Sequence, residues 1–296
     1  MKIAICLMGI VGGAKDNAGK AGQGQASLDP RISHESFKKQ IIKANPGAEI
    51  DVFIHTWSVD HEDTLTKLYN PKVILAEEQD PFDKGELYGF GIMPRDQTDM
   101  EYTETYRFRH YSNWCSKYRS IKLKHDYEKE NNMKYDAVLL GRLDMWYGKP
   151  IKFKKFDLRK VHVFNWHKDL GHCDHPQENR SVDVTFFGNS DIMNGFVTHF
   201  KNIKEYAREP LSPNLKDPVD GHSIAYNYVR DFAGANGVKH VFFEFEDWAL
   251  IRKIPTYSHR ICDERIIQDY GKTLKKLKLT DGDLEKFLKK QQESKE

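Results

Sequence analysis

The chain has 296 residues, of which 39% are hydrophobic and 30% charged, and its formal net charge is +2. This composition excludes an intrinsically disordered chain and supplies enough apolar side chains for a sizeable core. Because 46 basic and 44 acidic residues nearly cancel, no overall positive field favours a nucleic acid as partner. Four cysteines without a CxxC pair indicate reduced thiols and a cytoplasmic protein.

The chain opens on an apolar run, residues 2–7, followed by a glycine-rich stretch, residues 9–25. A signal peptide would also begin with a basic residue and an apolar run. The β-branched residues of this run suit a buried parallel strand, and we expect a strand that begins the domain. The glycine-rich stretch matches neither GxGxxG nor GxxxxGK[ST]; it would either approach a nucleotide closely or form a plain surface loop.

Short apolar runs then alternate with amphipathic stretches, which predicts an α/β fold with a mainly parallel sheet flanked by helices. In the first part of the chain we expect a helix at 33–44, a strand at 50–55, a helix at 63–69 and a strand at 73–76. A long loop at 77–100 and a helix at 104–131 follow. We then expect strands at 135–140, 161–165 and 182–188, helices at 191–207 and 222–232, and a last strand at 240–245.

One domain is expected to fill residues 1–270, with a basic helix or tail over residues 271–296. Within the longest helix, an exposed end is expected to carry Lys122, Lys124, Asp126, Glu128 and Lys129. No apolar run reaches the roughly 18 residues that would cross a bilayer, so no transmembrane segment is expected.

In open α/β sheets, ligands bind outside the carboxyl ends of the strands. The residues that directly follow the expected strands are therefore the first candidates for a binding site. They are Met8 and Gly9 after the first strand, His55, Thr56 and Trp57 after the second, and Arg142 and Asp144 after the strand at 135–140.

Arg142 and Asp144 carry the sharpest signal, because alternation along an extended segment would put both side chains on one face. A carboxylate binds Mg²⁺ or Mn²⁺ through oxygen, and a guanidinium forks onto phosphate oxygens. Such a pair can hold a metal-bound diphosphate. It would equally form a mutual salt bridge at a strand end, and the spacing leaves both interpretations open.

Later segments contain further candidates with a structural alternative for each. A histidine-rich stretch offers zinc donors at a crowded spacing and is equally typical of a loop over a site; its residues are His162, His167, His172, Cys173 and His175. Asp220 is either the N-cap of the following helix or a general base. Alternation places Glu244 and Glu246 on one face. At least one of them would line a pocket, or both would lie at a solvated end of the strand.

Three segments of the chain resemble a family of GT-A-type glycosyltransferases of viruses, phages and bacteria. They are the apolar run at residues 2–7, the DVFIHTW motif at 51–57, and the segment from Tyr135-Asp136 to the Arg142-x-Asp144 motif. The resemblance implies a Rossmann-like GT-A fold, a nucleotide-sugar donor, Mn²⁺ or Mg²⁺ as cofactor, and a glycan or other hydroxyl acceptor. For a viral member, the location would be the host cytoplasm.

The family commonly has Asp-x-Asp where this chain has Arg142-x-Asp144, so Asp144 is the only aligned carboxylate. Arg142 would replace part of the metal's charge on the leaving diphosphate. The family's order of residues implies Asp220 or Glu246 as the base, and His222 or His259 as a later metal ligand.

The carboxylates after the later strands favour an inverting reaction, although a retaining one stays open. Two other classes of function also remain. One is a nucleotidyltransferase acting on a sugar phosphate, and the other is a non-catalytic protein that binds nucleotide sugars.

Overall fold

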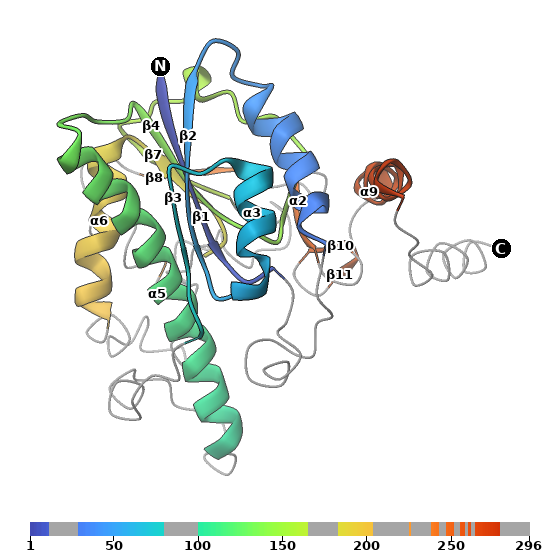
Figure 1. Cartoon of the computed structure of the whole chain (residues 1–296), viewed down its shortest axis with the longest axis horizontal. Helices are drawn as coiled ribbons and strands as arrows, with labels where there is room; N and C mark the ends of the chain where they lie inside the picture. Colours follow the sequence, from blue (N-terminus) through green and yellow to red (C-terminus); the bar gives the residue numbers. More distant parts are fainter. Residues whose placement is uncertain are drawn as a thin grey trace.

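The structure is a computed structural model, which describes residues 1–11, 29–79, 100–164, 183–203, 225, 238–242, 247–251, 255–257, 260–261 and 264–278. Seven described strands form one sheet, in the order β3-β2-β1-β4-β7-β6-β8 (Figure 1). Their bounds are β1 (Lys2–Gly9), β2 (Glu49–Thr56), β3 (Val73–Ala76), β4 (Ala137–Arg142), β6 (Val161–Phe164), β7 (Phe186–Gly188) and β8 (Val238–Val241).

Neighbouring strands of this sheet are parallel except where β7 pairs with β4 and β6, so β7 is the reversed strand. The expectation of an α/β protein with a mainly parallel sheet is confirmed. The first four strands lie close to their expected positions, because a strand buried on both faces is a continuous apolar run between turns.

Helices cover both faces of the sheet (Figure 1). On one face lie α2 (Pro30–Phe37), its π-helical continuation Lys38–Ile42, and α3 (Glu62–Tyr69); on the other lie α5 (Met100–Glu130) and α6 (Ser190–Lys201). Alternate residues of β1 face the two layers: Ile3, Ile5 and Leu7 pack toward α2 and α3, and Ala4, Cys6 and Met8 pack toward α5 and α6. Single 3-10 turns span Val59–His61 and Phe153–Lys155.

Helix α2 begins three residues before the expected start, for a local reason. The Asp29 carboxylate accepts the Arg31 N–H at 2.9 Å, which caps the helix, and Pro30 occupies its first position. Helix α3 ends at Tyr69 and is capped by Asn70, which adopts a left-handed conformation with φ 43°.

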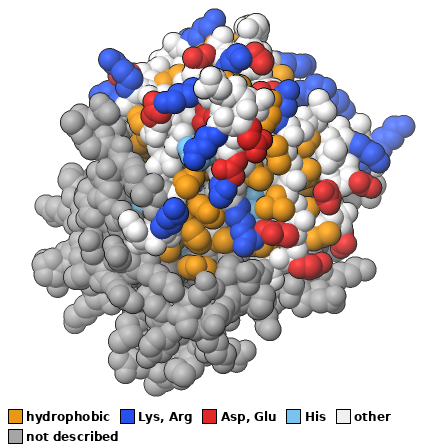
Figure 2. All heavy atoms as spheres, turned by 60° about the vertical axis from the view of Figure 1, so that its left-hand side comes forward, with side chains coloured by type: hydrophobic (Ala, Val, Ile, Leu, Met, Phe, Trp, Pro, Cys, Tyr) orange, Lys and Arg blue, Asp and Glu red, His pale blue; other side chains and the backbone are white. Residues whose placement is uncertain are grey.

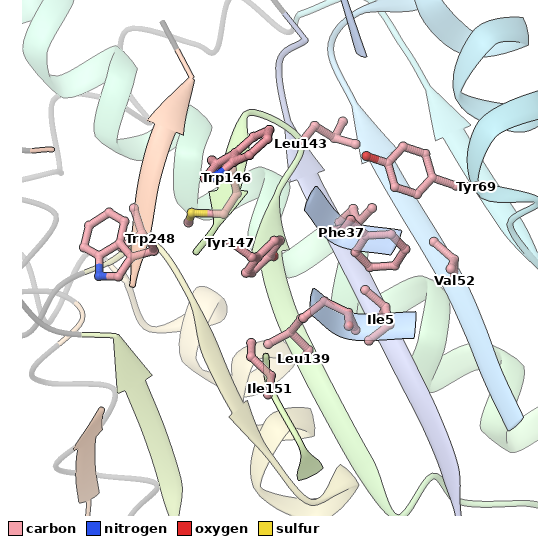
Figure 3. Close-up of a cluster of buried hydrophobic side chains, with 14 of the residues drawn as sticks. Ile5, Phe37, Val52, Tyr69, Leu139, Leu143, Trp146, Tyr147, Ile151 and Trp248 are labelled. Atoms are coloured by element: carbon pink, nitrogen blue, oxygen red, sulfur yellow. The ribbon is translucent and has the colours of Figure 1, made fainter. Parts of the chain in front are cut away.

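A second, four-stranded antiparallel sheet was not predicted from the sequence. It consists of β5 (Met145–Tyr147), β9 (Trp248–Ile251), β10 (Pro255–Tyr257) and β11 (Arg260–Ile261). Figure 3 shows Trp146 and Tyr147 of β5 and Trp248 of β9 in one cluster with Leu139 and Leu143. This cluster joins the small sheet to the main one.

Helix α9 (Glu264–Leu277) follows the second sheet and spans the boundary that the sequence placed after residue 270. It buries Tyr270 and Leu274, and the ring of Tyr270 meets Trp146 edge-on with centroids 5.8 Å apart. The helix expected at 222–232 lies outside the described residues, apart from Ala225.

The expectation that Lys124 and Glu128 lie on an exposed end of α5 is wrong. Both side chains are buried and joined by a 3.0 Å ion pair within α5. The ammonium of Lys124 also donates to Ser190 at 2.7 Å and to Asn194 at 2.7 Å. A lysine with a full set of acceptors can be buried, which a count of apolar residues at helical spacing does not detect.

On the face turned forward in Figure 2, Lys and Arg side chains are interspersed with Asp and Glu side chains and with hydrophobic ones. No helix in the described part of the chain is both long and apolar enough to cross a membrane.

Candidate functional site

The order of strands creates a switch point between β1 and β4. From β1 the chain proceeds to β2 and β3 on one side, and then returns to form β4 on the other side of β1. The connections on the two sides of such a point diverge and leave a crevice outside the carboxyl ends of the strands, where ligands of open α/β sheets bind. The candidate site is therefore the end of β1 with the ends of its two neighbours.

Seven of the described residues proposed from the sequence lie at or just beyond these strand ends. In the parallel register Met8 lies opposite both His55 of β2 and Arg142 of β4, and Gly9 lies opposite Thr56. The N–H of Trp57 donates to the carbonyl of Gly9 at 3.3 Å. The set is Met8, Gly9, His55, Thr56, Trp57, Arg142 and Asp144.

Gly9 ends β1 with φ 103°, a conformation that favours glycine. Its N–H donates to Ser116 Oγ of α5 at 3.0 Å, and its carbonyl accepts from Thr56 Oγ1 at 2.9 Å. Two neighbouring elements thus fix the last peptide of β1. A rigid backbone without a β-carbon lies at the centre of the switch point.

His55 has no exposed side-chain surface, and both ring nitrogens are engaged: Nδ1 lies 2.7 Å from Ser116 Oγ and Nε2 lies 2.8 Å from Glu77 Oε1. Burial lowers the pKa of His55 to about 4, and the Glu77 carboxylate only partly offsets this effect. The neutral ring donates from Nε2 to the carboxylate and accepts from Ser116, whose oxygen accepts from Gly9. A chain of hydrogen bonds therefore links Glu77 to the end of β1.

Trp57 is buried, and its ring contacts two side chains of this network. The guanidinium of Arg119 lies over the ring, 4.9 Å from the centroid, and His55 meets it edge-on at 4.5 Å. Arg119 also pairs with Glu77. The indole thus packs beneath an arginine and does not present a wide exposed face.

The expected alternation through Asp144 is corrected by the structure. Strand β4 ends at Arg142, and residues 143–144 form a turn into β5. The turn still brings the two side chains together: Arg142 Nε donates to Asp144 Oδ1 and Nη2 donates to Oδ2, each at 2.7 Å. This fork is the mutual salt bridge that the sequence left open.

The fork is largely covered, since 22% of the Arg142 side chain and 7% of the Asp144 side chain are exposed. Burial disfavours the charge of Arg142, but the bonds and charge of Asp144, together with the charge of Asp183, raise its pKa above the ordinary value. Arg142 therefore remains charged at neutral pH.

A second ion pair was missed by the sequence analysis. Lys117 of α5 has no exposed side-chain surface, and its Nζ lies 3.3 Å from Asp183 Oδ2 and 4.3 Å from the ring centroid of Trp114. Asn113 donates to the same Asp183 oxygen at 2.8 Å. Burial lowers the pKa of Lys117 to about 8; Asp183 opposes this shift and Arg142 adds to it.

Helical spacing could have revealed Lys117. It lies three residues after Trp114 and four before Ile121, which are both buried, so it falls on the inward face of α5. A charged residue at a core position is expected to have a partner or a function.

Several proposed residues cannot be placed. Outside the described residues lie Asp220, His222, Glu244, Glu246 and His259, and His167, His172, Cys173 and His175 of the histidine-rich stretch. Its described member, His162, is buried, bonds to the Asp157 carbonyl at 2.9 Å and stacks on Phe187 at 4.6 Å. Across the described ranges, no three His, Cys, Asp or Glu side chains are grouped as a metal site. Cys6 is a buried free thiol, and Cys115 is buried as well.

Comparison of the sequence with models of known protein families and with curated protein sequences gives no match. The function must therefore be argued from the geometry of the site.

Proposed function

We propose that the protein is a glycosyltransferase that takes a sugar from a nucleoside-diphosphate sugar and transfers it to a glycan or other hydroxyl acceptor. The observation that carries the proposal is the Arg142–Asp144 fork at the switch point beside Gly9. A diphosphate needs a cation and close approach of backbone, and these residues offer both. The mostly parallel sheet is compatible with the GT-A fold implied by the resemblance.

The charges of the site favour a metal-assisted reaction. The cations Arg142 and Lys117 are matched by the carboxylates of Asp144 and Asp183, so the four groups sum to no net charge. An entering diphosphate adds negative charge that this set does not neutralise. A divalent cation entering with the donor would restore the balance, as phosphate-bound Mg²⁺ or Mn²⁺ does in many nucleotide sites.

Asp144 is the described carboxylate that fits such a metal. Both of its oxygens accept from Arg142, and a carboxylate is the kind of oxygen ligand that Mg²⁺ and Mn²⁺ prefer. Mg²⁺ is usually held by one or two carboxylates together with substrate phosphates and water. A bound metal would stabilise the charge that develops on the leaving diphosphate.

The chain's own residues would position the donor and accept a proton. Arg142 keeps Asp144 oriented and adds positive charge beside the diphosphate. The acceptor hydroxyl attacks the anomeric carbon while the nucleoside diphosphate leaves, and a carboxylate takes the hydroxyl proton if the reaction inverts. Asp220 and Glu246 are our candidates for that base, by order along the chain.

The fork itself favours one alternative function. If the Arg142–Asp144 pair serves only to close the turn into β5, the protein would be a non-catalytic binder of nucleotide sugars. Turnover distinguishes the two functions, since a binder releases no free nucleoside diphosphate.

The test is to incubate the protein with a panel of nucleoside-diphosphate sugars in Mn²⁺ or Mg²⁺ and to measure release of the nucleoside diphosphate. Release with at least one donor, by hydrolysis or by transfer to an added glycan, is expected. A parallel reaction supplies nucleoside triphosphates with sugar phosphates. Pyrophosphate released there, with no turnover of any donor sugar, would identify a nucleotidyltransferase and contradict the proposal.

A further inference from the structure

Among the described residues, the ammonium of Lys117 has fewer acceptors than it can use. An ammonium has three N–H donors. Among the described residues, the printed contacts of Lys117 are Asp183 Oδ2 at 3.3 Å and the face of Trp114 at 4.3 Å. The first of these is long for a hydrogen bond between charged groups, which is usually 2.7–2.9 Å. The site therefore holds a buried cation with hydrogen-bonding capacity left over.

Lys124, seven residues later on α5, shows what a structural buried lysine in this protein looks like. Its ammonium donates to Glu128 at 3.0 Å, to Ser190 at 2.7 Å and to Asn194 at 2.7 Å, so each of its three N–H groups has an acceptor. Both side chains have no exposed surface. The two lysines lie on the same helix and are equally buried, but they differ in how many hydrogen-bond acceptors surround the ammonium.

Other buried N–H groups of α5 also lack a hydrogen-bond acceptor in the described structure. Nε1 of Trp114, the ring beneath the ammonium, is buried and has no hydrogen-bond acceptor within the described structure. Eight residues before Lys117 on the same helix, Nε of Arg109 is also buried without an acceptor among the described residues. Burying the Trp114 N–H unpaired costs free energy, which an acceptor-rich ligand that reaches both Trp114 and Lys117 would reduce.

Lys117 also lies beside the switch point. The charge of Arg142 acts on Lys117, and the charge of Asp183 acts on both, so these groups form one electrostatic cluster at the carboxyl end of β4. Within this cluster Arg142 directs two donors at Asp144. Lys117 is the cation of the cluster with the greater free capacity for an anion.

We propose that Lys117 binds the diphosphate of the donor, with its ammonium donating to phosphate oxygens that join or replace the Asp183 carboxylate. The inference deepens the proposed function and rests on it for the identity of the ligand. In the absence of ligand, Asp183 and Asn113 hold the ammonium in place. The ligand class is a diphosphate anion, recognised by a lysine from the helix in addition to the pair that ends β4.

Inorganic pyrophosphate is the probe, because it presents the diphosphate without a sugar or base. Its dissociation constant is measured calorimetrically with Mg²⁺ present, for the wild type, Lys117→Met, Lys117→Arg and the matched control Lys124→Met. We expect Lys117→Met to weaken binding by about 10- to 100-fold, the loss of one charge-assisted hydrogen bond. Lys117→Arg should recover part of the affinity, and folded Lys124→Met should bind as the wild type does.

Removing Lys117 alone leaves Asp183 without its cation, which can impair folding. The double variant Lys117→Met/Asp183→Asn removes both charges and keeps the cluster neutral, and it should fold and still lose pyrophosphate. Wild-type affinity in either variant, or no pyrophosphate binding by the wild type, would overturn the inference.

Failure of this inference and failure of the transferase can be told apart. If the wild type releases nucleoside diphosphate from a donor sugar while Lys117→Met binds pyrophosphate normally, only the role of Lys117 is wrong. If pyrophosphate binds through Lys117 but no donor sugar is turned over, the anion site stands and the transferase does not.

Discussion

Asp144 is both a structural partner of Arg142 and the proposed metal ligand, so its substitution should affect stability and activity together. Asp144→Asn removes a carboxylate that accepts two hydrogen bonds from a guanidinium in a largely buried place. We expect a loss of about 1.5–3 kcal/mol in the free energy of unfolding. Turnover by the protein that remains folded should fall by a factor on the order of 10².

An exposed copy of the same fork provides the control. Asp157 accepts from Nε and Nη2 of Arg159 at 2.9 and 3.2 Å, also with a spacing of two residues, but 82% of that arginine side chain is exposed. Asp157→Asn should leave the denaturant midpoint and turnover nearly unchanged. If Asp144→Asn behaved in the same way, neither the structural nor the catalytic role would stand.

His55 should make stability depend on pH. Its pKa is about 4 in the folded protein, below the usual 6.5, because burial disfavours the charged ring. The unfolded chain therefore binds more protons than the folded protein between these two pH values. The contribution of His55 to the free energy of unfolding is fully present above about pH 6.5 and is lost as the pH drops toward 4. The contribution of His55 is on the order of 3 kcal/mol.

The measurement is the free energy of unfolding in urea at several pH values from 7 to 4, for the wild type and His55→Gln. His34 and His162 also have pKa values lowered by burial, so they too contribute to the pH dependence of the free energy of unfolding of the wild type. The share of His55 is the difference between the two proteins. Identical pH dependence in both would mean that His55 is not held neutral.

At the scale of elements, β4 and β5 are packed closely together at Gly141. A β-carbon on Gly141 would lie 2.4 Å from Oη of Tyr147, and that hydroxyl is buried without a hydrogen-bond partner in the described structure. Gly141→Ala should cost about 1–3 kcal/mol by overpacking. Adding Tyr147→Phe removes the colliding oxygen and should restore most of the loss in thermal unfolding; an additive double variant would show that the two residues do not meet.

Helix α9 should depend on Tyr270 for its docking. The ring is buried against Trp146, and ion pairs join α9 to the region of α2: Lys39 with Asp269 at 3.1 Å, and Lys276 with Glu35. Tyr270→Ala should raise hydrogen exchange throughout Glu264–Leu277, because the aromatic anchor is worth about 3 kcal/mol. The exposed Lys272→Ala is the control. Unchanged hydrogen exchange in Tyr270→Ala would show that Tyr270 is not the residue that holds α9 in place.

For the molecule as a whole, the sequence predicted the main sheet better than the small one. Strands β1, β2 and β4 are long apolar runs, which stand out from their neighbours. Strands β5 and β10 have only three residues each, too few to show a period. The sequence predicted a basic helix or tail over residues 271–296 and did not predict that a helix begins at Glu264, because the lysines resemble those of a solvated tail, although Tyr270 and Leu274 are spaced by one turn.

The location of the candidate site followed from the topological rule, since the ends of adjacent parallel strands must meet. Its internal geometry could not be predicted. Whether Arg142 and Asp144 pair depends on the turn at residues 143–144, and Lys117 and Asp183 come from segments 66 residues apart. Such contacts are fixed by tertiary packing, which local periodicity does not encode.

The central claim is that the switch point binds a metal–nucleoside diphosphate complex, and thermal unfolding tests it most directly. A ligand at about 100 times its dissociation constant adds about 2.7 kcal/mol to stability. We predict that at least one nucleoside diphosphate raises the melting temperature of the wild type more in Mn²⁺ than in excess EDTA, and that Asp144→Asn loses the difference. No shift with any nucleoside diphosphate, with or without the metal, would contradict the account.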